Sequence, residues 1–72
     1  METPLVIRVL PARALNGWQV LVDGARRPVS IHERKSEAYL LAHTLASRGY
    51  TLVVHDEDGR VELRLPALRE AA

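Results

Sequence analysis

Apolar and polar side chains alternate along two short stretches near the N-terminus, residues 5–10 and 18–24. The apolar side consists of Leu5, Ile7 and Val9 in the first stretch and of Trp18, Val20 and Val22 in the second. A period of two residues is typical of a half-buried strand. Asn16 and Gly17 lie between the stretches, and both residue types tolerate the positive φ of a tight turn. The pattern predicts a first β-hairpin, with Pro11 at the end of its first strand.

Residues 28–32 have two interpretations. Val29 and Ile31 alternate with polar neighbours, which predicts a short third strand kept at the sheet edge by its proline. Ser30 and Glu33 have the spacing of a helix capping box, so an early helix start is the other interpretation. We favour the strand, because the helical period begins only later in the chain.

Residues 35–49 carry the one clear helical pattern. Apolar residues recur at spacings of three, four and seven and form a stripe of Ala38, Leu41, Ala42 and Leu45. Gly49 is placed to end the helix in a left-handed conformation. Leu40 projects nearly opposite the stripe, so it is either an ordinary exposed leucine or a subunit contact.

Residues 51–65 predict a second hairpin, whose register follows from the choice of turn. A two-residue Asp58-Gly59 loop makes apolar residues meet on one face. The pairs it produces are Val54–Leu63, Leu52–Leu65, His55–Glu62 and Asp56–Val61. A three-residue loop would set the apolar positions against charged ones, so we predict the shorter loop. Pro66 ends the second strand, and residues 66–72 are expected to form a frayed tail.

These elements together predict one small α+β domain over residues 1–72. We expect an antiparallel sheet of two hairpins, with or without the short edge strand, carrying one helix on one face in the order ββ(β)αββ. The chain has 72 residues, no cysteine and no phenylalanine, so its core must come from small aliphatic side chains and Trp18. Small cores without disulfides often gain stability by association, so we expect a homo-oligomer. A cytoplasmic location is expected too, because the sequence shows no secretory leader and no apolar run long enough for a membrane.

Charge is unevenly distributed along the chain, although the formal net charge is only +1. Residues 8–48 carry seven basic and three acidic side chains, whereas residues 49–72 carry three basic and five acidic ones. Such a split suits an anionic partner or head-to-tail self-association. The candidate nucleic-acid contacts lie around the helix start and are Arg26, Arg27, Arg34 and Lys35. The near-neutral charge and the expected burial of Trp18 argue against this use.

The stretch His55-Asp56-Glu57-Asp58 concentrates ionisable side chains. In the predicted register His55 points to a different face from the aspartates, so these side chains do not converge on one metal ion. A calcium loop fails because two of its ligand positions would be apolar, and the three histidines have no zinc-ligand spacing. We predict no metal, no cofactor and no catalytic residue. Structural roles are expected for Trp18 in the core, Gly49 at the helix end, and Asp58 and Gly59 in the turn.

The sheet face away from the helix is expected to mix apolar and polar side chains. Its predicted members are Val6, Arg8, Gln19, Leu21, Val53, His55 and Arg64. Such a mixture is typical of a subunit interface or a binding surface. We therefore predict a non-enzymatic binding module that acts as a homo-oligomer through this face or through Leu40, and a protein partner is a further candidate. The alternative is a nucleic-acid-binding protein, and a weaker one is an enzyme with a site shared between subunits. No membrane contact is expected.

Three motifs resemble a widespread group of small bacterial proteins catalogued only as a domain of unknown function: NGWQVLVDGARR, HERKSEAYLLAHTLA and TLVVHDEDGR. The matching positions are Gly17, Trp18, Val20, Gly24, Ala25, Arg27, Lys35, Glu37, Ala38, Ala42, Leu52, Val54, His55, Asp58, Gly59 and Arg60. The resemblance spans most of the chain and implies a compact sheet-and-helix domain, with no activity, cofactor or catalytic residue to transfer. Arg34 departs from the pattern, because the family usually has a helix-capping threonine there, and such a cap is worth about 1 kcal/mol. The helix start must find another partner, for which Ser36 and Glu33 are the candidates, or fray.

Overall fold

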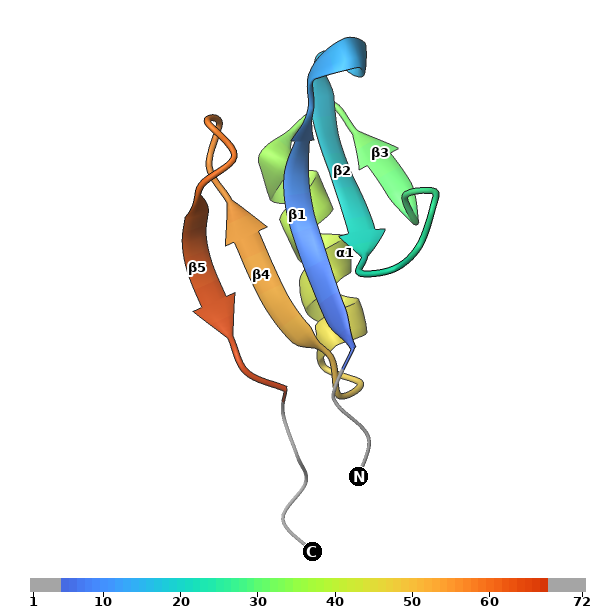
Figure 1. The fold of residues 1–72 in the computed structure, drawn as a ribbon, viewed down its shortest axis with the longest axis vertical. Coiled ribbons are helices and arrows are strands. Elements are labelled where there is room, and N and C mark those ends of the chain that lie inside the picture. The colour runs from blue at the N-terminus through green and yellow to red at the C-terminus, as the bar shows by residue number, and fades with distance from the viewer. Residues whose placement is uncertain (1–4, 68–72) are drawn as a thin grey trace, which may run out of the picture.

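Within residues 5–67, the fold consists of one five-stranded sheet and one α-helix (Figure 1). The computed structural model describes residues 5–67, so most of the predicted C-terminal tail lies outside the described residues. The elements in chain order are β1 Val6–Ala12, a single 3-10 turn Arg13–Leu15, β2 Gly17–Val22, β3 Ser30–His32, α1 Lys35–Ala46, β4 Thr51–His55 and β5 Val61–Leu65. The α+β class and the helix on one face confirm the prediction, and the short third strand is present. No helix within residues 5–67 is long and apolar enough to span a membrane.

The sheet is mixed, which corrects the prediction of a purely antiparallel one. Its strand order is β3-β2-β1-β4-β5, and β1 and β4 run parallel at the centre while all other neighbours are antiparallel. The short β3 causes the difference. It returns the chain to the end of the sheet where β1 finishes, so α1 runs back and β4 starts beside the start of β1 (Figure 1). Without β3, the same helix would deliver β4 antiparallel to β1.

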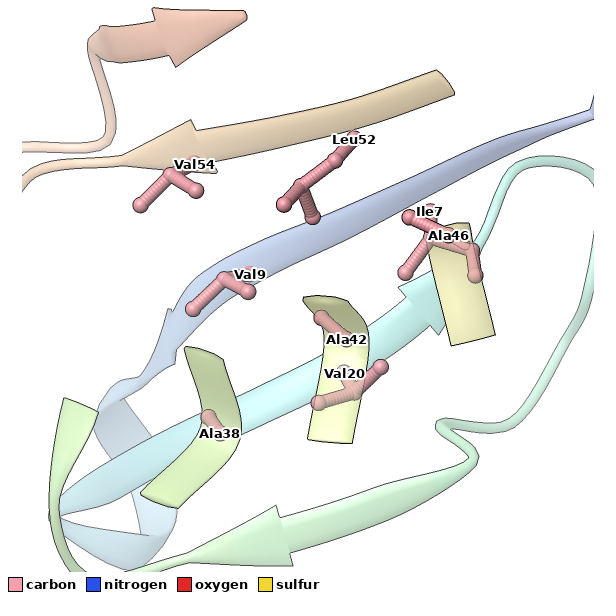
Figure 2. Close-up of a cluster of buried hydrophobic side chains, with 8 residues drawn as sticks. All are labelled: Ile7, Val9, Val20, Ala38, Ala42, Ala46, Leu52 and Val54. Atoms are coloured by element: carbon pink, nitrogen blue, oxygen red, sulfur yellow. The ribbon is translucent and has the colours of Figure 1, made fainter. Parts of the chain in front are cut away.

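The core lies between the three central strands and α1 (Figure 2). It is formed by Ile7, Val9, Val20, Leu52 and Val54 from the strands and by Ala38, Ala42 and Ala46 from the helix. The alanines recur every four residues on one side of the helix, and their small side chains let the helix backbone approach the strands closely. Leu41 and Leu45 of the predicted stripe and Trp18 are partly buried and pack around this cluster. The ring of Trp18 therefore borders the core.

The first hairpin differs from prediction in two details. β1 continues through Pro11 to Ala12. Pairing between β1 and β4 ends at Val9, so the N–H that Pro11 lacks on the β4 side costs no hydrogen bond between these strands. Asn16 has the positive φ expected of the turn, 53°. Gly17 instead opens β2, where an added Cβ would lie 2.5 Å from the backbone oxygen of His32. Glycine is therefore needed for β2 and β3 to pair at this point.

The start of α1 is capped without a threonine. Arg34 occupies the N-cap position with an extended backbone, and its side chain makes no capping bond. Its backbone N–H donates instead to Oε1 of Glu37 at 3.3 Å, and this carboxylate also suits the positive end of the helix dipole. The cap is thus neither Ser36 nor Glu33. At the other end, Gly49 has a φ of 108°, as predicted for the helix terminus.

The second hairpin has the predicted register along β4 up to a bulge. The regular pairs are Leu52–Leu65, Val53–Arg64 and Val54–Leu63. The bulge makes Glu62 an extra residue in β5 and sets His55 opposite Val61. Asp56 hydrogen-bonds the backbone of Arg60 instead. The predictions that His55 faces Glu62 and that Asp56 faces Val61 are therefore wrong.

Candidate binding surface

We call the side of the sheet turned away from α1 the open face; in Figure 1 α1 passes behind the strands, so this face is toward the viewer. The open face carries Val6, Arg8, Gln19, Leu21, Val53, His55 and Arg64. Register places them together, because Arg8 pairs with Leu21 on one side and Val53 on the other, and Val53 pairs with Arg64. These positions alternate with the core positions of the same strands.

Val53 lies at the centre of the open face and is only 3% exposed, although no second layer covers it. Its neighbours across the two ladders are Arg8 and Arg64. Long arginine stems can lie along an apolar neighbour while their charged ends stay in water. The middle of the open face is thus a valine flanked by two guanidinium groups. Within residues 5–67, Arg64 forms no ion pair, whereas Arg8 does.

A chain of polar contacts crosses the open face from Asp23 to the β4–β5 turn. Arg8 donates from Nε to Oδ1 of Asp23 at 2.6 Å and from Nη2 to Oδ2 at 3.2 Å, a two-pronged pairing. Its Nη1 lies 3.1 Å from Nε2 of His55. Nδ1 of His55 lies 2.9 Å from the carbonyl oxygen of Gly59. We call Asp23, Arg8, His55 and Gly59 the open-face network.

The open-face network selects one tautomer of His55. A carbonyl oxygen only accepts, so Nδ1 carries the proton and donates it to Gly59. Nε2 then accepts from Arg8. The residue is 7% exposed with both ring nitrogens bonded, so it ties the turn to the sheet. No group of three or more histidine and carboxylate side chains within residues 5–67 is placed to hold a metal ion.

The ion pair at the other end of the network stays near solvent. The hydrogen bond from Arg8 lowers the pKa of the Asp23 carboxyl, and the same bond raises the pKa of Arg8. The two side chains are 32% and 43% exposed, so water screens much of their attraction. The main consequence is positional, because a guanidinium held by Asp23 points its remaining nitrogen at His55.

Asp56 builds the turn that follows β4. Its Oδ1 accepts the backbone N–H groups of Asp58 and Arg60, each at 2.9 Å. These bonds, chiefly the one from Arg60, lower the pKa of the Asp56 carboxyl. Side-chain bonding of this kind favours a turn over a continued ladder, and Gly59 completes it at a φ of 86°. The turn is therefore longer than the two-residue loop predicted from pairing alone.

The four candidate nucleic-acid contacts lie at the two ends of β3. They are Arg26, Arg27, Arg34 and Lys35. Arg26 and Arg27 lie in the loop before β3, whereas the other two lie beyond its far end at the helix start. Lys35 is already engaged, with Nζ 2.5 Å from Oε2 of Glu62 and 5.0 Å from the ring centroid of Trp18. The three-residue strand β3 thus lies between the two pairs of basic residues.

Further apolar side chains are exposed on α1 and on β5. Leu40 on α1 is 67% exposed, as the helical pattern predicts. On β5, Val61 is 59% and Leu63 39% exposed. α1 packs mainly on the other four strands, and β5 forms one border of the sheet. An uncovered border strand presents unpaired backbone N–H and C=O groups to a partner.

Two residues that build the site, Asp23 and Asp56, could not be identified from the sequence pattern alone. In the sequence Asp23 is an ordinary polar residue at the end of a strand. Because Arg8 pairs with Leu21, Asp23, two residues after Leu21, lies diagonally across from Arg8 on the same face of the sheet. Asp56 reads as part of a solvated acidic tip, yet its side chain shapes the turn. An aspartate two residues before a further polar turn residue is the signal that could have indicated this role.

Comparison with known proteins places the fold in a family. A family model described as "Uncharacterized protein conserved in bacteria (DUF2188)" matches residues 7–65. The chain belongs to this family. The match contains the whole open-face network and confirms the expectation of a bacterial domain of unknown function. No curated protein and no solved structure matches the chain.

Proposed function

We propose that the protein is a non-enzymatic interaction module that acts as a homo-oligomer. The observation that carries this proposal is that one helix covers one face of the sheet and leaves the open face and β5 uncovered. Val61 and Leu63 on β5 and Val6 and Leu21 on the open face keep apolar area in water. Burying such area contributes roughly 25 cal/mol per Å². A chain of 72 residues without disulfides has much to gain from it.

The hydrogen bonds of the open-face network favour a structural role for its polar side chains. Arg8 bonds Asp23 and His55, and His55 bonds the Gly59 carbonyl. A general acid or base instead needs a bonding position left for substrate, usually beside a concave pocket. These contacts favour a rigid surface over a reactive one. That the protein is an enzyme with a site shared between subunits stays a weaker prediction. The cytoplasmic location also stays a prediction.

Nucleic-acid binding also stays a prediction, and the geometry gives it less support. Arg26 and Arg27 are separated from Arg34 and Lys35 by β3, and Lys35 is paired with Glu62. Phosphate contacts would make binding weaken steeply as salt rises. Gel-shift titrations with DNA and RNA at low salt test it, and no shift of either would end this alternative.

Light scattering of the purified chain at increasing concentration tests the main proposal. The proposal predicts a mass that rises above the 8.1 kDa of one chain as concentration increases. A mass of one chain at every concentration would overturn it. The same measurement at raised salt distinguishes apolar contacts, which persist, from surface ion pairs, which weaken.

A further inference from the structure

β5 is a border strand of the sheet that α1 leaves uncovered. Its inner border pairs with β4, and within residues 5–67 no strand pairs with its outer border. α1 packs mainly on the other four strands, and β5 lies away from the helix in Figure 1. The outer N–H and C=O groups of β5 are therefore open to the backbone of an added extended segment, which is a recurrent mode of peptide recognition.

The two faces of β5 offer different chemistry to such a segment. Leu63 and Leu65 each pair with a core residue of β4, so their side chains lie on the helix side of the sheet. Arg64 lies between them and pairs with Val53, so its side chain lies on the open face. Residues directly opposite each other in neighbouring strands share a face. A segment paired with residues 63–65 thus meets leucine, arginine and leucine in turn.

On the helix side, a cavity of about 210 Å³ lies next to β5. The residues that line it belong to or adjoin α1, β4 and β5, and include Ala46, Tyr50, Leu52, Leu65 and Pro66. A cavity of about 150 Å³ with apolar walls is large enough to bind benzene. Leu63, nearer the turn in the same strand, is 39% exposed. The helix-side positions of an added segment therefore favour apolar side chains of the size of leucine.

On the open face, Arg64 gives the middle position of the segment a preference for a carboxylate. Its side chain is exposed, and it forms no ion pair within residues 5–67. A carboxylate opposite Arg64 forms a favourable cross-strand pair, whereas a lysine would place like charges opposite each other. Glu62 does not pair with Arg64, because its carboxylate is bonded to Lys35 on the helix side.

We propose that β5 binds an extended segment of a partner protein in which one acidic residue lies between two large apolar residues. The segment extends the five-stranded sheet by one strand. Its acidic side chain lies opposite Arg64 on the open face, and its apolar side chains lie opposite Leu63 and Leu65 on the helix side. Backbone hydrogen bonds supply affinity for any extended chain, so selection comes from these three side chains.

A second copy of β5 does not offer this pattern. The bulge leaves Glu62 unpaired, and its carboxylate turns to Lys35 on the helix side, where the side chain of Leu63 also lies. In the bound segment, the acidic residue and its apolar neighbours must lie on opposite faces of the added strand. The partner is therefore a different segment, so this proposal goes beyond the proposed homo-oligomer and does not rest on it.

A labelled synthetic peptide tests the proposal. The probe is Ser-Thr-Leu-Glu-Leu-Thr-Ser with uncharged ends, titrated with the protein and followed by fluorescence anisotropy. We expect saturable binding, and replacing the glutamate of the peptide by lysine should raise the dissociation constant about tenfold. Replacing both leucines by threonine should raise it by at least as much, because the apolar contacts are lost. Failure of the glutamate peptide to bind at the highest soluble protein concentration, or equal binding of the glutamate and lysine peptides, would overturn the proposal.

Charge reversal in the protein identifies the residue that selects the acidic position. Arg64→Glu should reverse the preference, so that the lysine peptide binds more tightly than the glutamate peptide. Arg26→Glu makes the same change of charge in the loop before β3 and is the matched control, which should keep the preference of the wild type. Circular dichroism checks that both variants remain folded. A folded Arg64→Glu variant that still prefers the glutamate peptide would contradict the proposal.

Backbone methylation of the peptide distinguishes strand addition from binding through side chains alone. In a strand at the edge of a sheet, alternate N–H groups point to the neighbouring strand and to solvent. One modified peptide carries N-methyl groups on its two leucines, and the other carries them on its glutamate and threonines. One of the two should lose about tenfold or more in affinity, and the other should bind within about threefold of the unmodified peptide. Equal affinities of the two modified peptides would refute strand addition.

The outcomes separate this proposal from the homo-oligomer. A protein that stays a monomer at every concentration and binds the glutamate peptide would overturn the homo-oligomer and support the partner segment. A protein that self-associates but does not bind the peptide, even where dilution has made it a monomer, would do the reverse. If self-association uses β5, the glutamate peptide should also lower the mass measured by light scattering, and the lysine peptide should do so less.

Discussion

Replacing Arg8 by methionine removes the guanidinium that connects Asp23 to His55 while keeping a long apolar side chain at the position paired with Val53. The lost ion pair costs little, about 0–1 kcal/mol, because both partners are partly exposed. The larger loss is at His55, which is 7% exposed and whose Nε2 would lack its donor. An unsatisfied buried acceptor costs about 1–3 kcal/mol. We therefore expect Arg8→Met to lower the free energy of unfolding by about 1–3 kcal/mol.

Asp23→Asn is the matched control, because it keeps the shape of the side chain and leaves Arg8 beside His55. Its expected cost is below about 1 kcal/mol. Urea unfolding, followed by the fluorescence of the single tryptophan at one fixed protein concentration, measures both variants. The reasoning is refuted if Asp23→Asn costs as much as Arg8→Met, because the exposed ion pair and not the bond to His55 would then be the important contact.

Three substitutions and a change of pH probe the fold further. Arg34→Thr should raise the free energy of unfolding by about 0.5–1 kcal/mol, since the threonine hydroxyl would complete the capping box with Glu37; unchanged stability in urea unfolding would contradict it. Gly17→Ala should cost about 1–3 kcal/mol or more, because its Cβ would meet the backbone of β3 at 2.5 Å; an unchanged thermal midpoint would show that β3 moves aside freely. Stability should fall as pH drops below about 4, because the pKa values of Asp23 and Asp56 are lower in the folded chain than in the unfolded one, so their stabilisation is present above the unfolded pKa and lost as pH falls through the folded one. Asp56→Asn should flatten this dependence between about pH 5 and pH 3, and an identical slope would contradict the role of the turn carboxylate.

Local patterning accounts for what could be predicted of the fold. Alternation identifies the strands, and in the second hairpin it also fixes the Val54–Leu63 pairing, because a slip of one residue would turn charges into the core. The alanine and leucine stripe identifies α1 and the side it buries. Each of these inferences depends on residues of one helix, one strand or one hairpin, where the backbone period decides which side chains share a face.

The features that could not be predicted depend on single residues acting over longer distances. β3 is three residues long, yet its presence reverses the direction in which β4 meets β1. In the longer turn the carboxylate of Asp56 accepts hydrogen bonds from the backbone N–H groups of Asp58 and Arg60, and a pairing pattern alone does not indicate such bonds. The same β3 separates Arg27 from Arg34, which are close in sequence. The open-face network needed the register of two ladders at once before Arg8, Asp23 and His55 could be placed together.

Amide hydrogen exchange of the unmodified protein most directly tests the central claim, that the uncovered surfaces of the sheet self-associate, and β5 is the uncovered border strand whose backbone amides report it. β3 and β5 are the two border strands of the same sheet, so β3 serves as an internal control. The account predicts that exchange in residues 61–65 slows as protein concentration rises, while exchange in residues 30–32 does not change. The account would be contradicted if the exchange rate in residues 61–65, like that in residues 30–32, did not change as protein concentration rises.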